Sequence, residues 1–255
     1  MILAIDVGNT DITFGTIQDG VIGTVARIHT ERDYTPAEYG MKIKSLLDYY
    51  GVDPQGFEGA ILSSVVPPVT NILRLAVNRL TGLDCLIVGP GIRTGMNVRI
   101  DDPSTLAADL AVGSVAAISC YGTPAIVLEF GTATSMVVVD AKNSYRGGVI
   151  MPGVRLGLQA LSSGTSLLPD ISLTAPEKVI GTNTADAMRS GAVYATASMI
   201  DGMIDRMEEE LGSTCTVVAT GQNAQEILVH CRREILYDEN LLLKGLWVLY
   251  RKNRG

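Results

Sequence analysis

Two short segments of this sequence carry a carboxylate, a glycine and small hydroxyl residues in the same order. The first segment reads Asp6, Val7, Gly8, Asn9, Thr10, Asp11, Ile12, Thr13, and the second reads Glu129, Phe130, Gly131, Thr132, Ala133, Thr134. Glycine lets the backbone approach a phosphate closely, and successive N–H groups of a turn bind anions. Threonine hydroxyls add further donors. The repeated pattern predicts two loops that bind the phosphates of a nucleotide.

A nucleotide's phosphates also need a divalent cation, which prefers oxygen ligands. Asp6 ends an apolar strand next to the first loop, so we expect it to hold this cation directly or through water. Either segment alone would also fit a β-hairpin with ordinary turn residues. Two copies with matched spacing favour phosphate binding.

Strands and helices alternate around both segments, which is typical of an α/β fold. We expect two similar domains, residues 1–122 and 123–255, facing each other across a cleft. Thr35, Pro36 and Glu38 predict a capped helix start. The expected helices cover residues 36–50, 71–80, 109–120, 154–161, 185–211, a segment from 222 and a segment from 240.

The composition favours a protein that acts on small molecules. The net charge is −7, which argues against a nucleic-acid partner. The uncharged segment Leu110–Leu128 contains the turn signal Tyr121-Gly122-Thr123-Pro124, so we expect no membrane span. Met1 leads into an apolar strand without a basic leader, and the four cysteines lack metal-binding spacing. We therefore expect a cytoplasmic protein with reduced thiols.

One expected helix carries apolar residues at steps of three and four: Met188, Ala192, Ala195, Met199, Met203 and Met207. Such a stripe usually packs into the core. Because it is rich in methionine and small residues, part of it could instead form a dimer contact.

A set of short motifs then follows in a recognisable order. They are Asp6-Val7-Gly8-Asn9-Thr10, Ser63-Ser64-Val65-Val66-Pro67, Gly89-Pro90-Gly91, Phe130-Gly131-Thr132-Ala133-Thr134, Gly147-Gly148 with Pro152-Gly153, Asn183-Thr184, Met188-Arg189-Ser190-Gly191 and Ala219-Thr220-Gly221. Together they resemble the type III pantothenate kinases of the actin-like and sugar-kinase superfamily. The resemblance covers essentially the whole chain.

The resemblance implies two duplicated ribonuclease-H-like domains and ATP-dependent phosphorylation of pantothenate, the first step of coenzyme A synthesis. It also implies Mg²⁺, a monovalent cation (K⁺ or NH₄⁺), and a dimer with active sites at the subunit interface. By position, Asp6 to Thr13 form the first ATP loop, Gly131 and Thr132 contact ATP, and Glu129 lies at the monovalent-cation site. Asp109 is the expected general base, within Ala107, Ala108, Asp109 and Leu110, and Thr184 contacts pantothenate from the partner subunit.

The chain departs from the family on the substrate side. The family's Gly-Ala-Asp-Arg motif is Ala107-Ala108-Asp109-Leu110 here, a tyrosine is replaced by Ile100, and an aspartate is replaced by Glu129. Leucine offers no donor in place of the arginine. Three interpretations remain open: a pantothenate kinase with altered contacts, a catalytically weak paralogue that needs an intact partner subunit in a heteromer, or a kinase of another small alcohol. Asp109 alone would also fit a carboxylate stabilised at a helix N-terminus.

Overall fold

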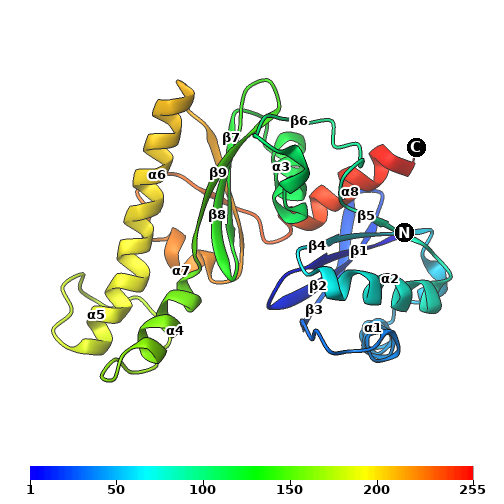
Figure 1. The fold of residues 1–255 in the computed structure, drawn as a ribbon, viewed down its shortest axis with the longest axis horizontal. Coiled ribbons are helices and arrows are strands. Elements are labelled where there is room, and N and C mark those ends of the chain that lie inside the picture. Colours follow the sequence, from blue (N-terminus) through cyan, green and yellow to red (C-terminus); the bar gives the residue numbers. More distant parts are fainter. Residues whose placement is uncertain (255) are drawn as a thin grey trace. The chain divides into compact units, whose positions relative to one another are not determined.

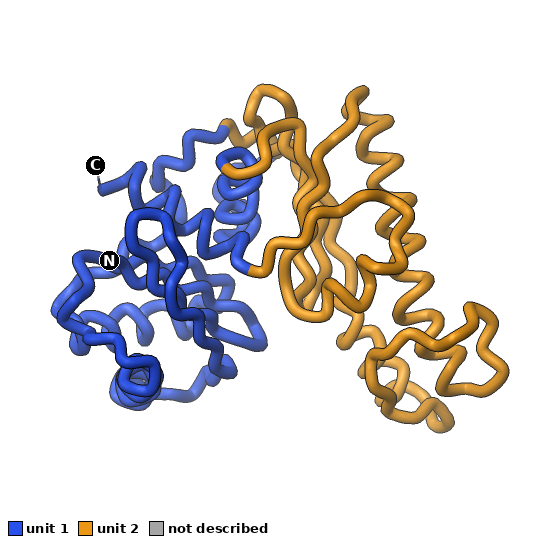
Figure 2. Tube along the Cα trace, turned by 180° about the vertical axis from the view of Figure 1, so that it is seen from behind, with its two compact units in different colours: residues 1–96, 101–119, 240–255 blue, residues 97–100, 120–239 orange. Residues whose placement is uncertain are grey.

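The computed structural model describes residues 1–254, and its contacts divide the chain into two compact units (Figure 2). Unit 1 contains residues 1–96, 101–119 and the segment that begins at Asn240. Unit 2 contains residues 97–100 and 120–239. The sequence division at residue 122 assigned the last segment to the second half of the chain, whereas its contacts join it to unit 1.

Unit 1 is built on a five-stranded sheet of order β3-β2-β1-β4-β5. β1 pairs antiparallel with β2 and parallel with β4, and β4 pairs parallel with β5. The strands are β1 (Ile2–Val7), β2 (Asp11–Gln18), β3 (Val21–His29), β4 (Gly59–Ser64) and β5 (Cys85–Ile87).

Unit 2 repeats this topology in the order β11-β10-β7-β8-β9, with β6 added at the edge. β7 pairs antiparallel with β8 and parallel with β10, as β1 does with its neighbours. The strands are β6 (Asn97–Val98), β7 (Ala125–Phe130), β8 (Ala133–Val139), β9 (Ser144–Pro152), β10 (Thr216–Gly221) and β11 (Leu236–Tyr237). The repeated order confirms the predicted duplicated ribonuclease-H-like α/β fold.

Helices cover both faces of the sheet in unit 1 (Figure 1). α1 (Pro36–Tyr49) and α2 (Pro67–Thr81) pack on one face. α3 (Ala108–Cys120) and α8 (Leu241–Arg254) pack on the other. Gly15 lies against Leu243 of α8, which explains why this late segment belongs to unit 1.

The starts of α1 and α2 show where the local sequence predicts the first residue of a helix and where it does not. Thr35 and Glu38 form the predicted reciprocal capping hydrogen bonds at the start of α1. The expected start of the next helix at residue 71 was too late, because α2 already begins at Pro67. Proline is well suited to the first turn of a helix, where its missing N–H has no partner in any case.

The helices of unit 2 are α4 (Val154–Gly164), α5 (Thr184–Ser190), a π-helical turn (Gly191–Ala195), α6 (Thr196–Leu211) and α7 (Ala224–Leu228). The predicted methionine stripe lies in the core only in part: Met188 is buried, and Met203 and Met207 pack against the core of unit 2. Val193, Ala197, Ile200 and Ile204 are buried, whereas Met199 is exposed. A π turn inserts an extra residue per turn, so a stripe drawn with uniform helical spacing does not follow one face through it.

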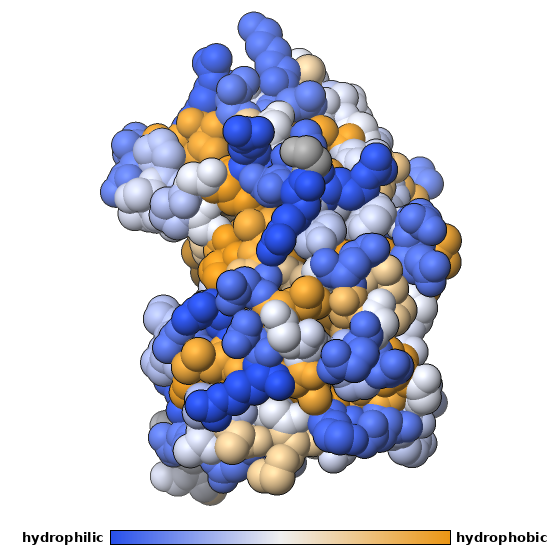
Figure 3. Space-filling model, turned by 90° about the vertical axis from the view of Figure 1, so that its right-hand side faces the viewer, coloured by the Kyte–Doolittle hydropathy of each residue, from blue (hydrophilic) through white to orange (hydrophobic). Residues whose placement is uncertain are grey.

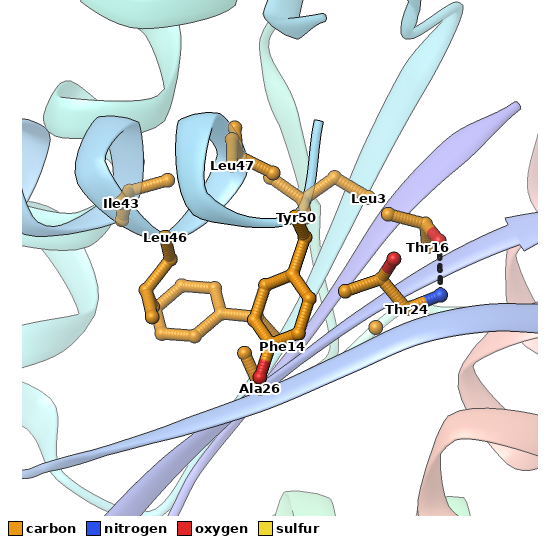
Figure 4. Close-up of a pocket in the computed structure, with 10 residues that line it drawn as sticks. Leu3, Phe14, Thr16, Thr24, Ala26, Ile43, Leu46, Leu47 and Tyr50 are labelled. Atoms are coloured by element: carbon orange, nitrogen blue, oxygen red, sulfur yellow. Dashed lines mark hydrogen bonds between the residues drawn. The ribbon is translucent and has the colours of Figure 1, made fainter. Parts of the chain in front are cut away.

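A small apolar cavity in unit 1 belongs to the core. It lies between α1 and strands β2 and β3, beside Phe14, Leu46 and Tyr50 (Figure 4). Its volume of about 10 Å³ is no larger than the space of one water, so it is a packing defect.

One face of the molecule shows a mixture of hydrophilic and apolar side chains (Figure 3). On the face drawn in Figure 3, hydrophilic side chains surround smaller apolar areas. Within residues 1–254, none of the helices combines the length and the apolar character that crossing a membrane requires.

Candidate functional site

Asp6 lies in a row of oxygen-bearing side chains across the sheet of unit 1. It is in register with Thr13 on β2 and with Ser63 on β4. Residues paired in this way point to the same face of a sheet. Ile2 and Ala4, which share this face with Asp6, pack against α3 and α8. Asp6 therefore faces α3, which carries Asp109, and α8.

Asp109 approaches Asp6 from the first turn of α3. Burial raises the pKa of Asp6 to about 7, helped by repulsion from the charge of Asp109 and opposed by Ser63. Burial also raises the pKa of Asp109, whereas the N–H of Leu110, 2.7 Å from its Oδ1, opposes this rise. Two neighbouring carboxyls with raised pKa values can bind a cation together or accept a proton.

Residues at the end of β3 support the first loop. The Gly8 N–H donates to the Asp11 carbonyl at 3.0 Å, and the Thr30 hydroxyl donates to the Gly8 carbonyl at 2.7 Å. Arg32 donates to the Asn9 side chain at 3.1 Å. Sequence reasoning missed Thr30 and Arg32, because the pairing of β2 with β3 alone brings them to the loop.

His29 also reaches this loop, although the sequence suggested no role for it. Its Nδ1 lies 2.9 Å from the Oδ1 of Asp11. The His29 side chain is 83% exposed and that of Asp11 is 19% exposed. His29, which is paired with Asp11 across strands β2 and β3, orients the Asp11 carboxylate.

Unit 2 repeats the arrangement around Glu129. On β7, Glu129 is in register with Ser135 on β8 and with Thr220 on β10. It occupies the same place, next to the last residue of its strand, as Asp6 does in β1. Each unit therefore sets one carboxylate between two hydroxyl residues of neighbouring strands, beside a glycine-containing loop.

Two glycines outside the second loop pack closely on it. A Cβ on Gly153 would lie 2.3 Å from the carbonyl oxygen of Gly131 and 2.5 Å from that of Thr132. A Cβ on Gly221 would lie 2.1 Å from the carbonyl oxygen of Phe130, at a backbone φ of +102°. The Gly153 N–H also donates to the Thr132 carbonyl at 3.0 Å. The second loop is thus fixed by backbone contacts that only glycine permits.

Replacing Gly153 by Ala should weaken ATP binding by about tenfold, an effect near 1.4 kcal/mol. The added methyl group displaces the backbone of Gly131 and Thr132, which the sequence analysis assigned to ATP. The measurement is ATP binding by titration calorimetry. Gly157→Ala is the matched control, because a Cβ on Gly157 meets nothing within 4 Å. Equal affinity in both variants would contradict a role of the second loop in ATP binding.

Thr184 lies elsewhere in unit 2, as the first residue of α5 after the N-cap Asn183. It is exposed. An open pocket of about 550 Å³ lies beside it, lined among others by Glu177, Lys178, Asp186 and Arg189. Within the units, the structure thus brings Asp109 to Asp6 and the first loop, and Glu129 to the second loop.

The residues around Asp6 fit a magnesium ion held mainly by the nucleotide. No cluster of three or more His, Cys, Asp or Glu side chains within residues 1–254 is suited to a metal. Mg²⁺ commonly binds one or two carboxylates together with substrate phosphates and waters. Asp6, with only oxygen-bearing neighbours in its row, provides such a donor.

The duplicated fold is shared with solved structures that have little sequence identity to this chain. A putative 2-dehydro-3-deoxygalactonokinase from Sinorhizobium meliloti shares this fold with a TM-score of 0.61 at 12% identity, over 98% of this chain and 96% of that structure. A family model described as type III pantothenate kinase matches residues 2–206.

Two curated relatives agree over nearly the whole chain. The type III pantothenate kinase of Halalkalibacterium halodurans is 42% identical over 99% of this chain and 100% of its own length. That of Bacillus cytotoxicus is 39% identical over 99% of this chain and 97% of its own length. The chain belongs to the type III pantothenate kinase family.

Proposed function

We propose that this protein transfers the γ-phosphoryl group of ATP to the terminal hydroxyl of pantothenate, the first step of coenzyme A synthesis, in the cytoplasm. Membership of the family along the whole chain carries this proposal. The duplicated carboxylate-and-loop geometry supports it, because phosphoryl transfer depends mainly on positioning and on neutralising charge.

Each part of the candidate site has a role in this reaction. The loop from Asp6 to Thr13 holds ATP phosphates, and Gly131 and Thr132 are further ATP contacts. Asp6 would hold Mg²⁺ together with the nucleotide phosphates, and the ion would supply positive charge to the transferred group. The hydroxyl oxygen of pantothenate bonds to the γ-phosphorus as the bond from that phosphorus to ADP breaks. Asp109 accepts the proton of the hydroxyl. The raised pKa of Asp109 makes this carboxylate a stronger base than an exposed aspartate.

Glu129 is the proposed ligand of a monovalent cation, K⁺ or NH₄⁺. Its place between Ser135 and Thr220 gives it oxygen-bearing neighbours on both sides. Glutamate is one methylene longer than the family's aspartate but supplies the same carboxylate oxygens.

We also propose that the protein acts as a dimer, with Thr184 contacting pantothenate in the partner's site. Unit 2 exposes several large apolar side chains: Leu156, Leu161, Leu167, Ile180 and Met199. A subunit interface would bury them. A heteromer with an intact paralogue would use the same surface.

The direct test is ATP-dependent phosphorylation of pantothenate by the purified chain, with Mg²⁺ and either K⁺ or NH₄⁺. Turnover supports the proposal. A folded chain that is inactive alone but raises the activity of an intact family member would instead support the heteromeric subunit.

Leu110 and Ile100 provide a sharper test of the substrate side. Leu110→Arg with Ile100→Tyr restores the family residues, and the added charge-assisted contact contributes about 1.5–3 kcal/mol. We expect kcat/KM for pantothenate to rise roughly ten- to a hundredfold. The control is Leu236→Arg, which adds the same charge on the edge strand β11, where Leu236 is 41% exposed.

The kinetic outcome separates the three interpretations. A gain from an inert wild type indicates a degenerate subunit. No gain in a wild type that is already active indicates that pantothenate binds through other contacts. A wild type and a double variant that are both inert toward pantothenate indicate another alcohol.

A further inference from the structure

Ser63 is a completely buried serine beside the proposed metal ligand. Its relative exposure is 0%. Its hydroxyl is among the buried side-chain atoms without a hydrogen-bond partner in the described part of the chain. On the adjacent parallel strand, Asp6 is its register partner. The unpartnered hydroxyl therefore lies on the same face of the sheet as the Asp6 carboxyl.

An unpaired buried hydroxyl is unfavourable by about 1–3 kcal/mol, so its presence in a core strand needs a reason. The next residue, Ser64, shows the ordinary structural use of serine at this strand end. The Ser64 Oγ accepts hydrogen bonds from the Thr70 hydroxyl at 2.8 Å and from the Val66 N–H at 3.1 Å, which tie β4 to the start of α2. Ser63 makes no such connection.

Burial also separates Ser63 from the other hydroxyl in the row. Thr13, on the opposite side of Asp6, is only half-buried, so a bound nucleotide can reach it. Ser63 is closed to solvent, so its hydroxyl can serve only a neighbouring protein group.

We propose that Ser63 is a positioning residue, whose hydroxyl donates a hydrogen bond to the Asp6 carboxylate and holds it in the orientation that binds the magnesium ion of the nucleotide. The inference rests on the proposed nucleotide binding. Asp6 has a second carboxyl, Asp109, nearby. A donor behind Asp6 fixes one of its oxygens and leaves the other for the ion. Such supporting contacts commonly change metal affinity or activity by about 10–100-fold.

The test measures how much Mg²⁺ strengthens ADP binding, by titration calorimetry of the purified chain with Mg²⁺ or with EDTA. In Ser63→Ala we expect this strengthening to fall by about tenfold, with ADP affinity in EDTA unchanged. Ser63→Cys keeps most of the volume but offers only a weak donor, so it should show most of the same loss. Ser64→Ala is the matched control one residue along the strand, on the opposite face, and should leave the strengthening unchanged.

Asp6→Asn supplies a second measurement. If Ser63 acts through Asp6, adding Ser63→Ala to Asp6→Asn should cause no further loss of the Mg²⁺ effect. The inference is overturned if Ser63→Ala binds ADP with the same Mg²⁺ strengthening as wild type, or if the two losses simply add. Wild type that binds ADP with Mg²⁺ but does not phosphorylate pantothenate would contradict the proposed function and leave this inference standing.

Discussion

Replacing Asp109 by Asn is expected to lower kcat for pantothenate phosphorylation by about 10²–10⁴-fold. Asn keeps the size of the side chain but cannot accept the hydroxyl proton. The Leu110 N–H donates a hydrogen bond to the Asp109 Oδ1. The amide oxygen of Asn can accept the same hydrogen bond, so the start of α3 should be preserved. The measurement is a coupled ADP-release assay, with ATP binding determined in parallel to separate catalysis from binding.

Asp102→Asn is the control for this substitution. Asp102 is exposed in the segment before α3 and accepts a hydrogen bond from the Ser104 N–H at 2.9 Å. Asn is an equally good acceptor at such a position, so activity should remain within about twofold of wild type. An Asp109→Asn variant that retains full kcat would remove Asp109 from the chemistry and favour its role as a carboxylate at a helix N-terminus.

The local part of the fold could be predicted from the sequence. The capping box at Thr35 and the strand that ends in Asp6 depend on neighbouring residues, and the structure contains both. The methionine stripe was right only in part, since Met188, Met203 and Met207 contact the core but Met199 does not. Its prediction assumed one uniform helix, but the π turn at Gly191–Ala195 changes the spacing and buries Val193 and Ile200 instead.

The surroundings of the site could not be predicted, because they depend on pairings between distant segments. Ser63 lies beside Asp6 only through the parallel register of β4 with β1. Thr30 reaches Gly8 only because β3 returns along β2. Single-sequence patterns contain periodicity and turn chemistry but not register between strands. The two carboxylates could be found from the duplicated pattern, whereas the hydroxyls that flank them required the sheet.

The second large effect concerns Asp6, where function and stability should change in opposite directions. The folded, metal-free protein holds the Asp6 proton up to about pH 7, whereas an unfolded aspartate loses it near pH 3.9. The free energy of unfolding contributed by this group is therefore highest below about pH 4 and falls as the pH rises towards 7. Asn has no charge to bury, so Asp6→Asn should raise the free energy of unfolding at pH 8 by about 2–4 kcal/mol.

The same substitution should lower kinase activity by at least about a hundredfold, because the Mg²⁺ ligand is lost. Urea unfolding without metal at pH 4 and pH 8 measures the stability effect, which should be present at pH 8 and nearly absent at pH 4. Asp48→Asn, which removes an exposed carboxylate 2.5 Å from Lys44, should change stability by less than about 1 kcal/mol at either pH. Mg²⁺ with ADP should stabilise wild type but not Asp6→Asn, since binding to the folded state alone raises its stability. If Asp6→Asn is instead less stable than wild type at pH 8, neighbouring groups of the folded protein stabilise the Asp6 charge. The expected destabilisation by that charge is then absent.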